Sequence, residues 1–277
     1  CEKSTYNAIW AMMANQAGLA ALFFKKMNPN IPFLLTLQEG DSEMDIWLRT
    51  WFMRPLYKNI YRKANYIQAI SNFLADRAKK MGAKCPIEIV PNGAGFNFGT
   101  LIMGKIDDRI GIFKKNNIII SSSRLVKKNS IDILIRAIAE IKEDSIRLVI
   151  LGDGILRKRM EALAIKLHLK RDYKSIDEDR DRVYFFGTVN PYQVGYYVGS
   201  SKIFARPSRT EGLGSSFLEA MSVGVPVIGT PVGGIPDFLK DGETGLFCKV
   251  DDPRDLAEKI LRLMQDENLY KKLSENG

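Results

Sequence analysis

Residues 202–229 read KIFARPSRTEGLGSSFLEAMSVGVPVIG, and this stretch decides the predicted fold. Two short apolar runs, at 202–205 and 226–229, have the length and composition of buried strands. Between them, a loop rich in glycine and serine leads into a predicted helix over residues 217–223. Two apolar strands joined by a helix are typical of a βαβ unit, in which the strands are parallel and both faces of the sheet are covered.

The same alternation continues on both sides of this unit. Further strands are predicted at residues 117–121, 146–151, 183–186 and 245–248. The segments between them carry apolar residues at helical spacing, as at Ile131, Leu134, Ile135 and Ile138. Residues 117–277 are therefore predicted to form one complete doubly wound α/β domain.

The first hundred residues repeat the pattern with fewer units. Strands are predicted at residues 31–38, 66–70 and 87–90, with a further candidate at 6–12. Residues 101–116 carry glycine and lysine without a firm period, so we predict an inter-domain linker there. The chain is thus expected to hold a partial domain at 1–100 and a complete one at 117–277.

The composition excludes several classes of protein. With 45% apolar residues the chain is globular, and it has no apolar run of about 18 residues that could span a bilayer. One histidine and three scattered cysteines argue against a disulfide scaffold, a zinc site and histidine-based catalysis. This cysteine usage favours a reducing, cytoplasmic location. The net charge of +9 leaves nucleic acid, an anionic membrane or an anionic small ligand as partners.

Much of the positive charge gathers in one stretch of the first domain. Its basic residues are Arg49, Arg54, Lys58, Arg62, Lys63, Arg77, Lys79, Lys80 and Lys84. Residues 45–62 interleave aromatic and basic side chains, a pattern typical of helices that lie on an anionic membrane, so residues 45–84 are a candidate membrane surface. A helix docked on the sheet with a solvated basic face is the alternative. Nucleic acid is not expected as a partner, because no nucleic-acid-binding motif occurs.

The predicted strands of the second domain end in glycines, small hydroxyl residues or fixed charges. These ends are 123–125 (SRL), 152–154 (GDG), 187–189 (GTV), 207–216 and 233–234 (GG). Parallel sheets bind ligands at the carboxyl ends of their strands, and free N–H groups at a helix start bind phosphate. Glu211 and Glu219 add carboxylates that can accept paired hydrogen bonds from sugar hydroxyls. The combination indicates a nucleotide-sugar site, although turn chemistry alone explains any single glycine.

These residues also resemble a known family. The run from Pro207 to Met221, which contains Glu211 and Glu219, resembles the E-x7-E signature of retaining, GT-B-fold glycosyltransferases of family 4, the glycosyl transferases group 1. The segments at 224–228, 232–236 and 241–245 resemble its continuation. Those at 90–93, 123–125, 152–154 and 186–189 resemble the same family in the same order. The resemblance begins near residue 34 and covers nearly all of the chain after it.

The resemblance implies two Rossmann-like doubly wound domains that face a cleft. It implies sugar transfer from a UDP- or GDP-sugar to a glycan, lipid-linked or other hydroxyl acceptor, with no metal and no other cofactor. Glu211, Arg124 and Gln38 are the implied catalytic residues, with Glu211 on the donor sugar and Arg124 on the diphosphate. The implied donor-binding residues are Lys128, Asn129, Gly152, Val189, Gly212, Leu213, Gly214, Ser215, Ser216 and Glu219, with Glu219 on the ribose and Val189 beside the base.

Three departures from the family pattern qualify these expectations. Asn129 stands where the family has a phosphate-binding lysine, and Gln38 stands where it commonly has a first-domain histidine. The opening glycine-rich loop is not found, so the chain is expected to be a fragment with an incomplete N-terminal domain. A non-catalytic nucleotide-sugar-binding or peripheral membrane subunit of the same fold is therefore the alternative function. The expected location is cytoplasmic, with peripheral attachment to the inner face of the membrane.

Overall fold

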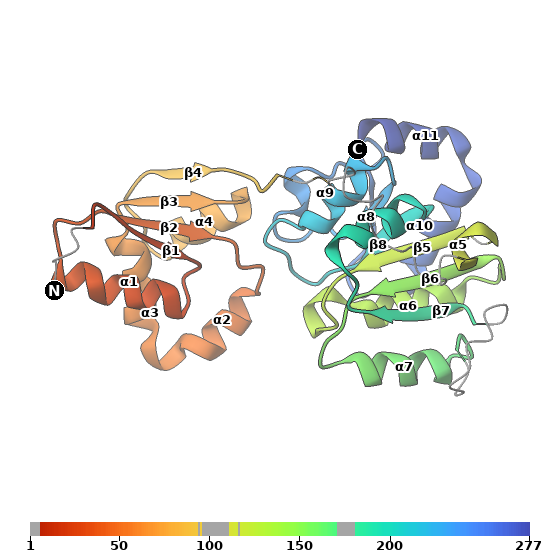
Figure 1. The fold of residues 1–277 in the computed structure, drawn as a ribbon, viewed down its shortest axis with the longest axis horizontal. Helices are drawn as coiled ribbons and strands as arrows, with labels where there is room; N and C mark the ends of the chain where they lie inside the picture. Colours follow the sequence, from red (N-terminus) through yellow and green to blue (C-terminus); the bar gives the residue numbers. More distant parts are fainter. Residues whose placement is uncertain (1–5, 94, 96–110, 116, 171–180) are drawn as a thin grey trace. The chain divides into compact units, whose positions relative to one another are not determined.

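The computed structural model (Figure 1) describes residues 6–93, 95, 111–115, 117–170 and 181–277. The chain divides into two compact units, the first formed by Cys1–Asn92 with Thr210–Leu213 and the second by Gly93–Arg209 with Gly214–Gly277. Most of the linker predicted at residues 101–116 lies outside the described residues. Its described part forms the short helix α5 (Gly111–Lys115), whose Ile112 and Phe113 are buried in a core of the second unit.

The first unit is built on a parallel sheet in the order β1-β2-β3-β4. The strands are β1 (Ile9–Met12), β2 (Phe33–Leu37), β3 (Tyr66–Ala69) and β4 (Ile87–Ile89), each inside a predicted strand. The helices are α1 (Gln16–Met27), α2 (Glu43–Thr50), α3 (Arg54–Lys63) and α4 (Asn72–Lys80), with a 3-10 turn η1 (Trp51–Met53) before α3. Pro55 lies in the first turn of α3, where its missing N–H leaves no helical bond unmade.

The described strands of this sheet follow one another in one direction, without a reversal. Right-handed crossovers that step in one direction place successive helices on the same face of a sheet. Accordingly α1 packs on α3, and the strand residues Phe33 and Leu35 on the covered face are buried. Trp10 and Met12 point to the opposite face and are exposed.

The second unit has a parallel sheet in the order β10-β9-β8-β5-β6-β7. The strands are β5 (Asn117–Ser122), β6 (Ile146–Leu151), β7 (Val183–Gly187), β8 (Ile203–Arg206), β9 (Val227–Gly229) and β10 (Leu246–Phe247). The chain winds from β5 to β7 on one side, then returns to β8 on the other side of β5. The winding therefore reverses between β5 and β8, where doubly wound sheets bind their ligands.

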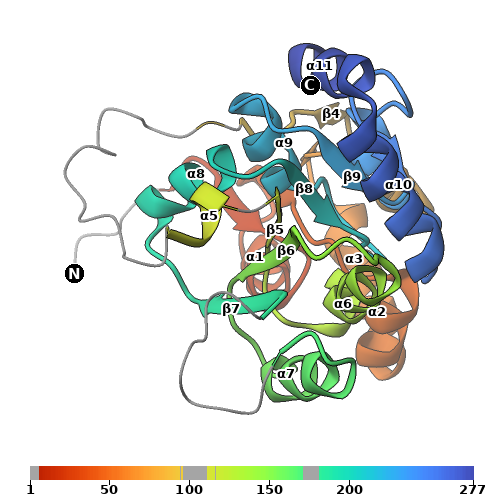
Figure 2. The same cartoon turned by 90° about the vertical axis from the view of Figure 1, so that its right-hand side faces the viewer.

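Helices cover both faces of this sheet (Figure 2). One core packs the sheet against α6 (Ile131–Glu140), α7 (Arg157–Lys166), α10 (Pro253–Gln265) and α11 (Glu267–Asn276). The other packs it against α5, α8 (Pro191–Gly199) and α9 (Ser215–Ser222). Neighbouring residues of one strand serve opposite cores, as Ile119 and Ile120 do, which is why the strands are apolar throughout. Burial of both sheet faces explains why the apolar runs of residues 117–277 indicated a doubly wound domain.

Arg77 of α4 is buried, which corrects its inclusion in the predicted basic surface. Its side chain is 1% exposed and lies over the Phe73 ring at 4.7 Å. The guanidinium donates hydrogen bonds to the backbone carbonyls of Glu39 at 3.4 Å and Asp41 at 2.7 Å. Arg77 therefore fastens the loop that follows β2, and its charge is not available to a surface partner.

We expect Arg77→Ala to lower the free energy of unfolding by about 2–5 kcal/mol, because it leaves a cavity and two carbonyl groups without their donor. Urea denaturation at constant pH measures this change. Lys79→Ala, on the same helix with an exposed side chain, is the matched control and should change the value by no more than about 0.5 kcal/mol. Equal losses in the two variants would show that Arg77 does not fasten the loop.

Candidate functional site

The candidate donor site lies in the second unit, at the carboxyl ends of β5 and β8. The loop after β5 carries Ser123 and Arg124 and continues into the 3-10 turn η4 (Lys127–Asn129). The loop after β8 leads to the first residue of α9, Ser215. Because the two strands are neighbours and parallel, these two loops leave the same edge of the sheet.

Hydrogen bonds to backbone carbonyls fix the loop after β5, while the Arg124 side chain remains exposed to solvent. The Asn129 amide donates to the carbonyl of Arg124 at 2.7 Å. The backbone N–H of Arg209, which follows β8, donates to the carbonyl of Lys128 at 2.7 Å. Asn129 is buried, Lys128 is half-buried and Arg124 is exposed. Asn129, which replaces the family's lysine, therefore fixes the backbone that presents Arg124.

Gly152 allows the turn after β6 to approach the same loop closely. Its φ is +120°, and a Cβ atom at this position would lie 2.0 Å from the carbonyl oxygen of Ser123. No side chain fits there without displacing the backbone next to Arg124. The structure thus explains Gly152 by chain packing, and a direct contact with the donor stays a prediction.

The N-terminus of α9 presents free donors at this edge. Gly214 occupies the N-cap with φ +96°, and no side chain caps the helix. The first N–H groups of a helix have no partner inside it, and the helix dipole adds partial positive charge there. Ser215 and Ser216 are the first helical residues, so their backbone suits an anionic group such as a phosphate.

Buried hydroxyl groups without hydrogen-bond partners mark the same region. Among the described residues these include Ser121 Oγ at the end of β5, Ser123 Oγ in its loop and Ser216 Oγ in α9. A buried polar group without a partner costs about 1–3 kcal/mol, and native proteins rarely leave several together. These hydroxyl groups lie at the edge of the sheet where doubly wound domains bind their ligands.

Glu219 lies one turn further into α9 and is half-buried. Burial raises its pKa above the usual value, and the nearby Arg206 guanidinium offsets this in part. Arg206 ends β8, is buried, donates to the carbonyl of Ser122 at 3.2 Å and lies over the Phe217 ring at 4.9 Å. Arg206 was not among the predicted site residues, although a cation at the end of the apolar run KIFAR is a visible signal in the sequence.

The remaining predicted donor residues lie in two loops. Val189 follows β7, is half-buried and packs against the core that contains α8 and α9. The loop between β8 and α9 contains Glu211, Gly212 and Leu213. These three residues belong to the first compact unit. Gly212 and Leu213 are buried and Glu211 is half-buried.

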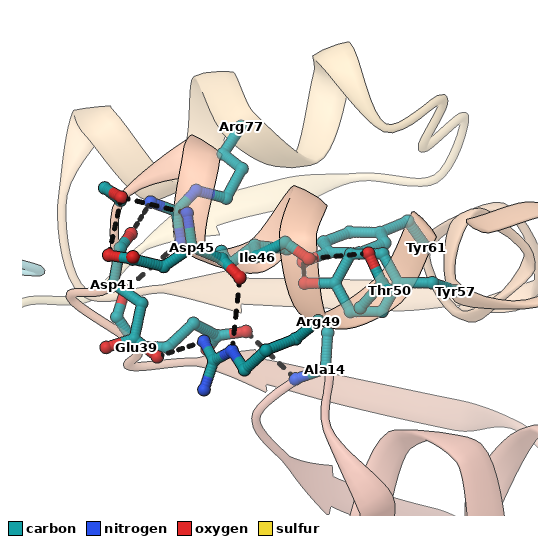
Figure 3. A network of polar contacts seen from close by, with 11 residues as sticks. Ala14, Glu39, Asp41, Asp45, Ile46, Arg49, Thr50, Tyr57, Tyr61 and Arg77 are labelled. Carbon is teal, nitrogen blue, oxygen red and sulfur yellow. Dashed lines mark hydrogen bonds and ion pairs between the residues drawn. The ribbon is translucent and has the colours of Figure 1, made fainter. Parts of the chain in front are cut away.

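In the first unit, a polar network surrounds the carboxyl ends of β1 and β2 (Figure 3). Glu39 Oε1 accepts from the backbone N–H of Ala14 at 3.0 Å, and Oε2 accepts from that of Gln38 at 3.1 Å. Asp41 is paired with Arg49 beside it. Glu39 therefore connects the two strand ends, a role that the sequence analysis did not assign to this acidic residue after β2.

A pocket of about 360 Å³ opens beside this network. Its polar lining includes Glu39, Asp41, Arg49, Thr50 and Tyr57, and its apolar lining includes Met13, Leu19, Ile46 and Met53. The Tyr57 hydroxyl lies 2.9 Å from that of Tyr61, and burial raises the pKa of both tyrosines, so both remain protonated at neutral pH. Carboxylates beside apolar side chains suit a hydroxyl-bearing organic group.

Neither a metal-binding cluster nor a membrane-spanning helix occurs in the described parts of the chain. No group of three or more histidine, cysteine, aspartate or glutamate side chains there has an arrangement that could hold a metal ion. None of the helices there combines the length and the apolar character that crossing a bilayer requires.

This fold and site agree with a family model. Residues 103–277 match the model of the glycosyl transferases group 1, and the chain belongs to this family. An uncharacterized glycosyltransferase of Methanocaldococcus jannaschii is 29% identical over 270 residues, which cover 95% of this chain and 66% of that protein. The N-acetyl-alpha-D-glucosaminyl L-malate synthase of Bacillus anthracis is 32% identical over 176 residues, covering 63% of this chain and 43% of the synthase. The chain thus spans less than two thirds of either relative.

A solved structure shows the same fold. Anabaena HepE, in complex with UDP and glucose, matches with a TM-score of 0.82 at 19% identity, over 98% of this chain and 72% of that one. The predicted fold class, GT-B with two Rossmann-like domains, is confirmed.

We expect Gly152→Ala to lower the free energy of unfolding by about 1–3 kcal/mol, because the added Cβ would displace the loop that carries Arg124. The unfolding midpoint in urea measures the loss. Gly199→Ala at the end of α8, where the nearest atom would lie at 4.0 Å, should be close to neutral. If Gly152→Ala were equally neutral, the two loops could not be in the contact described here.

Proposed function

We propose that the protein is a retaining glycosyltransferase of family 4 that transfers a sugar from a UDP- or GDP-sugar to a hydroxyl acceptor. The unpartnered buried hydroxyls beside the uncapped start of α9 and the exposed Arg124 are the observation that carries this proposal. They combine neutral donors, a helix dipole and a fixed positive charge at the point where the winding of the sheet reverses. Helix N-termini and arginine side chains are groups that bind phosphate.

In the proposed reaction, the backbone N–H groups of Gly214, Ser215 and Ser216 bind the diphosphate. Arg124 neutralises the negative charge that grows on it as the bond to the sugar breaks. Lys128 adds positive charge from the same loop. Because Arg124 and the dipole of α9 supply positive potential, we propose that no metal or other cofactor takes part.

The remaining contacts would orient the nucleotide and the sugar. Glu219 accepts hydrogen bonds from the two ribose hydroxyls, and Glu211, with Gly212 and Leu213, contacts the donor sugar. Val189 lies beside the base. HepE is bound to UDP in its structure, and for this chain either UDP or GDP remains part of the proposal.

The acceptor is proposed to be a glycan or a lipid-linked hydroxyl compound that binds through the first unit. The pocket beside Glu39 supports this, since it joins carboxylate acceptors to an apolar wall. Gln38, next to Glu39, can donate a hydrogen bond to a reacting group but cannot exchange a proton with it. The proposed location is cytoplasmic, peripheral on the inner face of the membrane.

The same Gln38 motivates the second candidate, a non-catalytic subunit that binds nucleotide sugars or attaches to the membrane. A nucleotide-release assay with UDP-glucose and GDP-mannose, run with and without glycan acceptors, separates the two functions. Nucleotide released faster than the spontaneous rate supports the enzyme. Tight nucleotide binding with no release above that rate would favour the subunit.

We expect UDP or GDP to stabilise the protein, by about 2.7 kcal/mol at a hundred times its dissociation constant. Glu219→Gln should reduce this thermal shift at neutral pH, because the ribose keeps an amide acceptor but loses a charged one. Without nucleotide, Glu219→Gln should not destabilise the protein at neutral pH. Burial raises the pKa of Glu219. The free energy of unfolding therefore falls as the pH rises from the usual glutamate pKa to this raised pKa, and Glu219→Gln removes that loss.

Glu258→Gln, at an exposed position of α10, serves as the matched control and should keep the full nucleotide shift. For UDP-glucose or GDP-mannose, the affinity of the wild type should fall as the pH is lowered through the raised pKa of Glu219, and Glu219→Gln should remove that dependence. A full nucleotide shift in Glu219→Gln would exclude the proposed contact with the ribose.

A further inference from the structure

Helix α2 and turn η1 of the first unit expose a group of large apolar side chains. Its members are Met44, Trp47, Leu48, Trp51 and Phe52, which we call the α2 patch. Trp51 is 66% exposed and Phe52 is 67% exposed. Soluble proteins rarely expose so many large apolar side chains together unless the surface binds something.

The patch is a second apolar face of α2. Met44, Trp47, Leu48 and Trp51 follow one another at i, i+3, i+4 and i+7, the spacing of one helix face. The inward face is formed by Ile46, the buried residue of α2. α2 therefore packs on the first unit through Ile46, and its outward apolar residues remain exposed.

A hollow of about 460 Å³ adjoins the patch and is lined by Met44, Ile46, Trp47, Tyr57 and Met81. Arg54 lines the same hollow and is exposed. Lys58 follows one turn later on α3, and neither cation forms an ion pair within the described ranges. The nearby acids are engaged: Glu43 pairs with Lys80 at 3.3 Å, and the Ser42 hydroxyl donates to Asp45 at 2.6 Å.

We propose that the α2 patch binds an anionic lipid bilayer, with its aromatic side chains at the level of the headgroups and Arg54 and Lys58 on lipid phosphates. Tryptophan suits this depth because its ring is apolar and its N–H remains hydrated. Cations beside the apolar face add attraction to anionic lipids. A second copy of the chain fits less well, because a two-fold interface would bring the same cations together.

This inference narrows the membrane surface predicted at residues 45–84. Arg77 is buried, and Lys79 and Lys80 are paired with Asp76 and Glu43. We place the binding surface on α2, η1 and the start of α3, where Arg54 lies beside the exposed apolar side chains. Membrane binding by this surface does not depend on the proposed sugar transfer, since none of the surface residues belongs to the proposed donor site.

The test is sedimentation of the whole protein with vesicles of phosphatidylcholine alone or with about 30% phosphatidylglycerol. We expect binding to the anionic vesicles, weakened by salt, with a blue shift of tryptophan emission. The double variant Trp51→Ser with Phe52→Ser should bind at least about tenfold more weakly, because two interfacial aromatics are lost. Arg54→Gln with Lys58→Gln should weaken binding to anionic vesicles and reduce its salt dependence.

Tyr192→Ser, which removes a 60% exposed aromatic side chain from the second unit, is the matched control and should bind like the wild type. Unfolding midpoints and nucleotide shifts establish that each variant is folded. Failure of the wild type to bind anionic vesicles would overturn the inference and leave the proposed sugar transfer untouched. Equal binding by the Trp51–Phe52 variant would also overturn it. If the wild type formed dimers at high concentration and the Trp51–Phe52 variant did not, the inference would also be overturned, and the patch would be assigned to a second copy of the chain.

Discussion

The second unit depends on the position of β5 between β6 and β8 in a parallel sheet. Because the winding reverses at β5, two loops distant in sequence leave the same edge of the sheet. Arg124 lies in one loop, and the other leads to the start of α9. Arg209 ties them together, since its backbone N–H and its guanidinium donate to the carbonyls of Lys128 and Lys127 at 2.7 Å each. The candidate donor site follows from this one adjacency.

The same site is locally unfavourable for folding. Ser123 Oγ and Ser216 Oγ are buried without partners, and burial raises the pKa of Glu219. A structure keeps such groups only where surrounding packing outweighs them, as the two cores on the faces of this sheet do. In the proposed reaction this local penalty would have a use, because preorganised donors need little rearrangement when a diphosphate binds.

In the first unit, a charged side chain is buried and large apolar side chains are exposed, which reverses the usual distribution. Arg77 lies in the interior and holds a loop, whereas Trp51 and Phe52 lie in solvent. The exposure follows from α2 and η1, since α2 buries only Ile46 and η1 buries none of its residues. Arg77 is buried because its guanidinium bonds the carbonyls of the loop that follows β2. Counting basic residues along the chain could not distinguish a buried arginine from the exposed Arg54, because the chemical type of a residue does not specify what packs on it.

The sequence by itself determined the α/β class and the position of each described strand to within about three residues. Apolar runs and helical spacing are local properties of the chain, so they can be read without knowing its neighbours. The run around Glu211 and Glu219 indicated the kind of site for the same reason. Arg206 and Glu39 could not be predicted in this way, because their contacts depend on which strands are adjacent. For Arg206 these strands are β5 and β8, and for Glu39 they are β1 and β2. Only the tertiary structure decided that order, together with the burial of Arg77 and the exposure of Trp51, because contacts between distant segments have no local signature.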